Sequence, residues 1–174
     1  YPVEKIVSKS GGASNELNRE NIDYSYFNTN KIYAHSILTS TSGESKLETV
    51  FTYDLYDKKG NIRQYTTSDG VSGVIIWGYN YLYPIAKIEN ATFEEVTGII
   101  KASKLEEISV KTTPNSSDIE MLDELRSNEK LKDNAQVTIY THNPLVGVLT
   151  IKNPQGLILN YHYDDYGRLQ QTSY

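Results

Sequence analysis

One seven-residue pattern occurs twice in the chain and constrains its fold more than any other feature. The segments YDKKGNI and YDDYGRL both read Y-D-x-x-G-[NR]-[IL], and they begin 107 residues apart, at Tyr56 and Tyr163. An Asp that starts a turn can accept bonds from backbone N–H groups two or three residues later, and a Gly can supply the positive φ where the chain reverses. Each segment therefore predicts a β-hairpin turn whose Tyr covers the hairpin. The residues that define the two turns are Tyr56, Asp57, Gly60, Tyr163, Asp164 and Gly167.

The residues around these turns alternate between apolar and polar, as half-buried strands do. Phe51, Tyr53 and Leu55 fall on one face of an extended chain. The same kind of pattern predicts strands or hairpins over 1–8, 24–36, 61–67, 74–79 and 136–174, with a turn at the glycines of 11–12. Pro84 fits a sheet only at an edge, a strand start or a bulge, so a bend is expected there. The predicted fold class is mainly β, with antiparallel hairpin repeats that form a twisted sheet.

Residues 91–133 interrupt this pattern. The segments Thr92–Glu95 (T-x-x-E) and Ser117–Glu120 (S-x-x-E) each have the form of a capping box, which marks the start of a helix. Apolar residues at helical spacing follow both, so the sequence predicts a two-helix insertion that packs on the sheet. The expected buried positions are Phe93, Val96, Ile100, Ile119, Leu122 and Leu125. The positions expected to face water are Glu94, Glu95, Asp123 and Glu124.

Charge and composition exclude several classes of protein. The formal net charge of −5 and the pI near 5.2 argue against a nucleic-acid partner, which needs a positively charged surface. No apolar run approaches the roughly 18 residues of a membrane span, and the chain has no Cys for disulfides or thiolate chemistry. The chain starts at Tyr1 without a Met, and we interpret it as an excised fragment. The cut edges, near 3–7 and 169–173, are therefore predicted to self-associate.

No motif in the sequence indicates an enzyme. The three imidazoles, His35, His142 and His162, do not have the spacing of a metal site. Neighbouring carboxylates such as Glu94 and Glu95 point about 100° apart on a helix, whereas glycosidase carboxylates converge across a cleft. The signatures of serine nucleophiles, P-loops and dinucleotide folds do not occur. The prediction is a non-enzymatic protein with no cofactor and no metal.

An aromatic row spaced by two residues suggests two alternatives. Trp77, Tyr79, Tyr81 and Tyr83 share one face of any continuous strand. If that face is exposed, the rings can stack on sugars, and the chain is a glycan-binding or adhesive surface module. If the face is buried, the rings belong to the core beneath the helices. Ile75 is expected on the same face, which favours the core.

The doubled motif resembles the YD-repeat, or Rhs, family, which includes the extracellular shells of teneurins and of insecticidal toxin complexes. In that family each repeat is a β-hairpin, and many hairpins spiral edge to edge into a hollow shell. Residues 77–96 and 137–169, together with YPVEKIVS at the N-terminus, are similar to a sub-branch of bacterial surface proteins with a helical insertion between YD hairpins. The resemblance covers the chain from Phe51 onward and the first fifty residues only loosely.

The resemblance implies a function and a set of partners. The chain would be one structural segment, residues 1–174 with the insertion at 91–133, of a secreted or cell-surface bacterial β-shell. Such a shell encloses or presents other segments, for example a C-terminal toxin. The implied partners are adjacent YD repeats of the parent chain, an enclosed toxin or a surface glycan. Two YD motifs are too few to enclose a cavity, so only part of a shell is expected.

The segment NPQGL at 153–157 resembles the DPxGL motif at which many Rhs shells cut themselves. Asn153 stands where that motif has Asp, and a YD hairpin follows at once. Asn-Pro-x-Gly is also the sequence that a β-turn with Pro at its second position favours. We interpret the segment as a turn.

Overall fold

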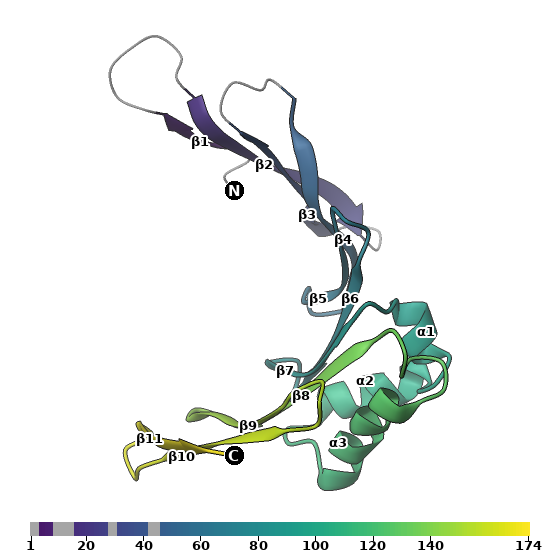
Figure 1. The fold of residues 1–174 in the computed structure, drawn as a ribbon, viewed down its shortest axis with the longest axis vertical. Helices are drawn as coiled ribbons and strands as arrows, with labels where there is room; N and C mark the ends of the chain where they lie inside the picture. The colour runs from purple at the N-terminus through teal and green to yellow at the C-terminus, as the bar shows by residue number, and fades with distance from the viewer. Residues whose placement is uncertain (1–3, 9–15, 28–30, 42–45) are drawn as a thin grey trace. The chain divides into compact units, whose positions relative to one another are not determined.

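The computed structural model describes residues 4–8, 16–27, 31–41 and 46–174. The chain divides into an N-terminal unit, Tyr1–Val71, and a C-terminal unit, Ser72–Tyr174. Eleven strands, three α-helices and one 3-10 helix lie in the described residues (Figure 1). Each strand within a unit pairs antiparallel with the next strand of that unit. The predicted fold class, a mainly β chain of antiparallel hairpins with a helical insertion, is confirmed.

The N-terminal unit contains five strands in sequence order. They are β1 (Glu4–Ser8), β2 (Glu16–Phe27), β3 (Lys31–Thr41), β4 (Glu48–Tyr56) and β5 (Ile62–Thr67). The predicted strand over 1–8 corresponds to β1, and the predicted hairpin over 24–36 corresponds to parts of β2 and β3. The predicted turn at 11–12 lies outside the described residues.

The described residues of the N-terminal unit bury no apolar side chain. Those that are buried are Ser36, Ser40 and Asp57. Aromatic rings contact one another on the sheet instead: Tyr33 and Tyr56 stack with centroids 4.6 Å apart, and Phe27 meets Tyr56 edge to face at 5.0 Å. Ladder hydrogen bonds and ring contacts therefore stabilise this unit in place of a packed core.

The C-terminal unit contains six strands, again in sequence order. They are β6 (Ser72–Gly78), β7 (Tyr83–Glu89), β8 (Gln136–Asn143), β9 (Gly147–Lys152), β10 (Ile158–Tyr163) and β11 (Leu169–Ser173). The pairing of β6 with β7 shifts register between Ile76 and Trp77, and Trp77 lies opposite Pro84. Pro84 thus stands at the start of a strand and opposite a bulge, which are two of the three positions predicted for it.

The helical insertion holds three α-helices instead of the predicted two. They are α1 (Phe93–Thr97), α2 (Ala102–Val110) and α3 (Ser116–Asp123), and the 3-10 helix η1 (Glu124–Ser127) follows. The first helix ends at Gly98, its C-cap. The prediction missed α2 because Lys101, its N-cap residue, makes no capping bond with its side chain. Its start therefore carries no sequence signal of the kind that marks the other two helices.

One of the two predicted capping boxes is correct. The Thr92–Glu95 box is present in α1. The Ser117–Glu120 box is wrong, because Asn115 caps α3 two residues earlier. Its side chain accepts a bond from the Asp118 N–H at 2.9 Å, and the Asp118 carboxylate accepts one from the Asn115 N–H at 2.9 Å. Asn is as good an N-cap as Ser, and here both halves of the box are satisfied by the earlier pair.

The core of the C-terminal unit lies between one face of the sheet and the helices. Sheet residues with buried side chains are Val74, Ile76, Ile85, Ala86, Ile88, Val137 and Ile139, and helix-side residues are Val96, Ile100, Leu105, Ile108, Leu122, Leu125 and Leu131. Phe93 and Ile119 are half-buried against this cluster. The predicted packing of the insertion on the sheet is confirmed. Ile75 is only half-buried, because Val74 and Ile76 occupy the core face of β6.

Most of the residues predicted to face water do so. Glu94, Glu95 and Glu124 are exposed. Asp123 is an exception, because it is partly buried and bonds Arg126 at 2.9 Å and Lys152 of β9 at 2.5 Å. Arg126 also donates to the carbonyls of Asn153 and Pro154 at 2.6 Å each. These polar contacts fix the end of the insertion to the turn between β9 and β10.

Candidate functional site

The two YD turns have the same main-chain geometry. In the first, the Asp57 N–H donates to the Asn61 carbonyl at 2.9 Å and the Gly60 N–H donates to the Asp57 carbonyl at 3.1 Å. In the second, the corresponding bonds of Asp164 and Gly167 measure 3.0 and 2.9 Å. Gly60 has φ +94° and Gly167 has φ +72°, so the predicted positive φ is confirmed at both glycines.

The Asp side chain closes each turn in the same way. Its Oδ1 accepts from the N–H groups two and four residues later, at 2.8 and 2.9 Å for Asp57 and at 3.0 and 2.9 Å for Asp164. Its Oδ2 accepts from the side chain four residues later, which is Asn61 in one turn and Arg168 in the other. The Arg168 N–H bond, aided by the Arg168 guanidinium and the Tyr166 N–H, lowers the pKa of Asp164 despite some desolvation. The carboxylate therefore satisfies the turn's N–H groups without help from a neighbouring layer.

The Tyr of each motif bonds to the preceding strand. Tyr56 Oη donates to the Ala34 carbonyl on β3 at 2.6 Å, and Tyr163 Oη donates to the Val148 carbonyl on β9 at 2.9 Å. Tyr163 also lies against Gly147, where a side chain would collide with the phenol. Whereas the sequence predicted that the ring covers its own hairpin, the hydroxyl ties that hairpin to the strand before it.

Partial burial of Tyr56 favours its neutral, hydrogen-bonding form. Desolvation, with the nearby phenols of Tyr53, Tyr33 and Tyr24 as further causes, raises the pKa of Tyr56 to about 12. The hydroxyl therefore keeps its proton, and its bond to Ala34, over the whole neutral range.

Two further turns use the same main-chain pattern. The turn Asn153–Leu157 has bonds of 2.9 Å from the Asn153 N–H to the Leu157 carbonyl and from the Gly156 N–H to the Asn153 carbonyl. In the turn Thr67–Val71 the equivalent bonds measure 3.0 and 2.9 Å. Both glycines, Gly156 and Gly70, have φ +84°. The turn predicted at 153–157 is therefore confirmed, and all four turns have a short polar residue three positions before a Gly.

The aromatic row does not lie on one strand. Strand β6 ends at Gly78, and Tyr79, Asn80 and Tyr81 form the turn to β7 with φ values of 52°, 59° and 65°. Tyr79 and Tyr81 are buried, whereas Trp77 and Tyr83 are half-buried. The left-handed turn breaks the two-residue period on which the shared face depended. Tyr79 and Tyr81 are therefore buried, as the alternative that placed these rings in the core expected.

The structure brings two of these rings together around a histidine. Tyr83 stacks on His142 with centroids 4.9 Å apart, and Tyr79 meets His142 edge to face at 5.5 Å. Tyr79 Oη accepts from the His142 N–H at 2.9 Å, and His142 Nε2 lies 2.8 Å from the Pro84 carbonyl. The cluster joins the turn between β6 and β7 to the end of β8.

The described residues give no further site of a familiar kind. Within them, no three His, Cys, Asp or Glu side chains are placed to hold a metal ion. Every helix in this part of the chain is too short or too polar to cross a membrane.

Comparison with known proteins gives limited similarity. No protein-family model and no curated protein matches the chain. Among solved structures, it is similar to a chain in the crystal structure of TcdB2-TccC3-Cdc42, with 12% identity and a TM-score of 0.48. The alignment covers 90% of this chain but only 7% of that chain.

Proposed function

We propose that this chain is a structural segment of a YD-repeat, or Rhs, β-shell outside the bacterial cell or at its surface. Its hairpins would pair with adjacent repeats of the parent chain and help to enclose or present other segments, such as a C-terminal toxin. The role is architectural, and we expect no catalysis.

The observation that carries this proposal is the repeated bond from the motif Tyr to the preceding strand. Tyr56 and Tyr163 make it in different units, at 2.6 and 2.9 Å. A wall built from hairpins needs each hairpin to hold the one before it. A Tyr that bonds a main-chain carbonyl can do so regardless of the side chain at that position.

The turns support the same role, because they do not depend on a second layer. Asp57 and Asp164 each satisfy two main-chain N–H groups of their own turn. The N-terminal unit holds its strands together although its described residues bury no apolar side chain. A sheet of this kind can form a boundary one layer thick.

An extended chain tests the proposal. A copy of residues 153–174 joined after Tyr174 supplies one more turn, a new β10 and a new YD hairpin. We expect the new β10 to pair with β11 and to slow hydrogen exchange of the outward amides of Leu169–Ser173. A slowing of about tenfold corresponds to about 1.4 kcal/mol of added opening free energy.

The matched control carries the same extension with the copied Asp164 and Tyr163 changed to Ala and Phe. It should protect β11 less, because the new hairpin has lost its turn bonds and its tie. Equal exchange of β11 amides in the original, the extended and the control chains would show that the edge does not accept repeats, and the proposal would be wrong.

A further inference from the structure

In the C-terminal unit, the turns between β6 and β7, between β8 and β9 and between β10 and β11 each expose one large apolar side chain. These turns are the first, second and third hairpin ends. Leu82 is 67% exposed, Leu145 is 99% exposed and Tyr166 is 84% exposed. The first two ends are joined by the bond between the His142 N–H and Tyr79 Oη. The second and third lie side by side, since a Cβ added at Gly167 would come within 3.9 Å of Val146 Cγ1. We call Leu82, Leu145 and Tyr166 the apolar ends.

The backbone at these ends is held in an unfavourable conformation. Five non-glycine residues in the described part of the chain have positive φ, and four of them lie here: Tyr79, Asn80, Tyr81 and Leu145. A left-handed conformation is unfavourable for an ordinary residue, because its Cβ comes too close to the following carbonyl oxygen. Leu145, with φ +73°, is almost fully exposed and gains little burial in return. Such strain tends to cluster at binding surfaces.

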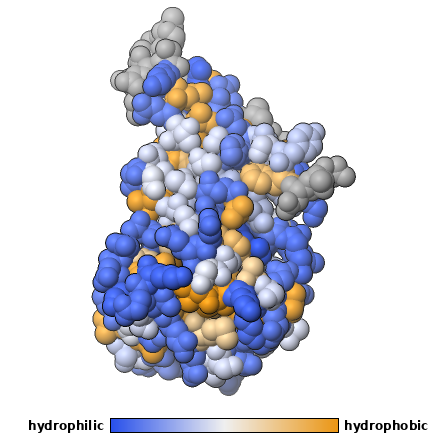
Figure 2. Space-filling model, turned by 90° about the vertical axis from the view of Figure 1, so that its right-hand side faces the viewer, coloured by the Kyte–Doolittle hydropathy of each residue, from blue (hydrophilic) through white to orange (hydrophobic). Residues whose placement is uncertain are grey.

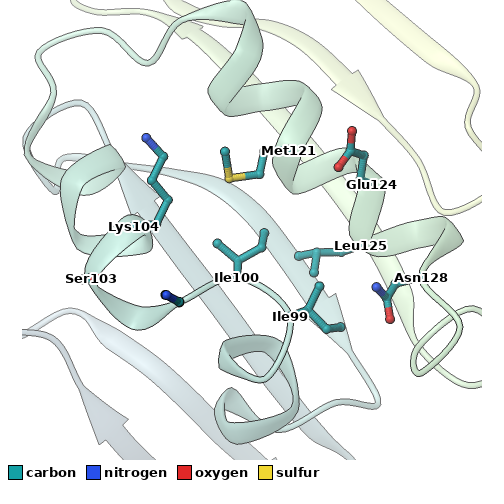
Figure 3. A pocket seen from close by; sticks show the side chains of 9 residues that line it. Ile99, Ile100, Ser103, Lys104, Met121, Glu124, Leu125 and Asn128 are labelled. Atoms are coloured by element: carbon teal, nitrogen blue, oxygen red, sulfur yellow. The ribbon is translucent and has the colours of Figure 1, made fainter.

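A pocket of about 360 Å³ lies in the helical insertion (Figure 3). Its walls include Ile99 and Ile100, which precede α2, Met121 of α3 and Leu125 of η1. These side chains point toward one another in Figure 3. On the face shown in Figure 2, hydrophilic residues surround apolar ones in the lower part of the molecule. The walls are suited to an apolar side chain.

The pocket and the apolar ends lie at opposite ends of α2. Lys101 and Lys104, from the N-terminal end of this helix, line the pocket. At its C-terminal end, the carbonyls of Ser109 and Lys111 accept bonds from the first hairpin end, from the N–H groups of Tyr81 at 3.1 Å and Asn80 at 2.8 Å. The C-terminal unit therefore has protruding apolar side chains near the C-terminal end of α2 and an apolar pocket near the N-terminal end of that helix.

The charges beside the two surfaces are complementary. Lys101 and Glu124 line the pocket, and among the described residues neither forms an ion pair. Asp165 and Arg168 flank Tyr166. Asp165 likewise has no ion pair in the described part of the chain, and Arg168, which bonds Asp164, remains largely exposed. A carboxylate and a guanidinium at one surface thus match an ammonium and a carboxylate at the other.

We propose that Leu145 of one copy inserts into this pocket of a second copy, and that Asp165 pairs with Lys101 across the contact. The two surfaces differ, so the contact is heterologous and can continue from copy to copy in a head-to-tail row. This interaction goes beyond the proposed shell role, which requires only strand pairing between repeats of one chain.

Sedimentation velocity over a range of concentrations tests the proposal, with Gln170→Lys and Thr172→Lys present throughout to block pairing through the edge strand β11. We expect association in this background, and Leu145→Glu should abolish it. Leu157→Glu is the matched control, because Leu157 is 59% exposed on the turn at the other end of β9 and should leave association unchanged. Lys101→Asp and Asp165→Lys should each weaken association about tenfold, and the double variant should restore it.

Three results would overturn the proposal. The first is a monomer at every concentration in this background. The second is association that survives Leu145→Glu in it. The third is Leu145-dependent binding to phosphatidylcholine vesicles without self-association, which would assign the apolar ends to a lipid surface. The extended-chain experiment measures hydrogen exchange of the β11 amides only. The shell proposal and the head-to-tail proposal can therefore fail independently of each other.

Discussion

The phenol of Tyr163 occupies the space that a side chain at Gly147 would fill. A Cβ built on Gly147 would lie 2.5 Å from Tyr163 Oη and 3.0 Å from Cζ. The same hydroxyl donates to the Val148 carbonyl, one residue further along β9. The Tyr-to-strand tie therefore requires a Gly beneath the ring.

Gly147→Ala should destabilise the protein by about 1 to 3 kcal/mol, the usual cost of overpacking. Tyr163→Phe should cost about 0.5 to 1.5 kcal/mol through the lost hydrogen bond. The double variant should cost less than the sum, because removing Oη relieves the closest contact. Urea unfolding of the four proteins measures the coupling, and strict additivity would show that the ring does not rest on Gly147 in solution.

Gly60 and Gly167 hold equivalent positions but differ in their surroundings. Both have positive φ, whereas only at Gly60 would a Cβ collide with another group, Tyr33 Oη at 2.8 Å. Gly167→Ala should therefore cost about 1 kcal/mol from backbone strain alone, and Gly60→Ala should cost more. Valine at either position should add further strain, to about 1 to 3 kcal/mol. Equal costs for the two alanine variants in thermal unfolding would contradict the contact with Tyr33.

Alkaline pH should weaken the protein through Tyr56. Unfolded tyrosines lose their proton near pH 10, whereas burial raises the pKa of Tyr56 to about 12. Between these values the unfolded chain releases a proton that the folded chain keeps. The stabilisation is therefore complete below pH 10 and is lost as the pH rises through 12. Urea unfolding across this range should show a smaller pH dependence for Tyr56→Phe than for the original protein.

The control for this effect is Tyr166→Phe, because Tyr166 is exposed at a hairpin end. This variant should keep the pH dependence of the original protein. If Tyr56→Phe and the original protein lose stability in parallel above pH 10, Tyr56 is not the group responsible.

The purified protein should show no hydrolase activity. No motif of the sequence supplies a nucleophile, a base and an orienting group together, and within the described residues the three imidazoles are in separate surroundings. His142 contacts Tyr83 and His162 bonds Ser173, whereas His35 lies 6.1 Å from the ring of Phe27. Screening with ester, glycoside and peptide substrates measures this. Turnover that disappears when one of these histidines is substituted would contradict it.

The edge strand β11 should also pair with other chains. It bonds β10 on one side, and its residues are Leu169, Gln170, Gln171, Thr172 and Ser173, none of them charged. Unpaired main-chain groups of such a strand are a template for another strand. Gln170→Lys combined with Thr172→Lys should reduce edge pairing at high protein concentration, measured by sedimentation in the Leu145→Glu background. A Leu145→Glu protein that is already monomeric without these lysines would show that the edge does not pair.

Much of this fold could be predicted because its turns carry their own chemistry. The Asp and Gly of each YD motif make bonds within five residues, so a local sequence pattern is enough to find them. The capping box at Thr92 is local in the same way. The start of α2 and the bond of Tyr163 to Val148 depend instead on tertiary contacts, which no short pattern contains.

The prediction for the aromatic row likewise failed where the structure depends on tertiary contacts and not on local sequence. The spacing of Trp77, Tyr79, Tyr81 and Tyr83 predicted one face because a strand was assumed. The turn that interrupts them is made by Tyr and Asn residues in the left-handed region, which sequence rules assign chiefly to Gly. Its N–H groups bond the end of α2, which is contributed by residues about thirty positions later. That partner explains the turn and could not be predicted from the residues within it.

The absence of buried apolar side chains from the described N-terminal unit has a thermodynamic consequence. The heat capacity change on unfolding comes mainly from apolar surface that becomes hydrated. The described apolar side chains of this unit are only partly buried, so each should contribute less to that change than a side chain of the core beneath the helices of the C-terminal unit. The stability of the N-terminal sheet should then curve less with temperature, and cold should weaken it less than it weakens the helix-covered sheet.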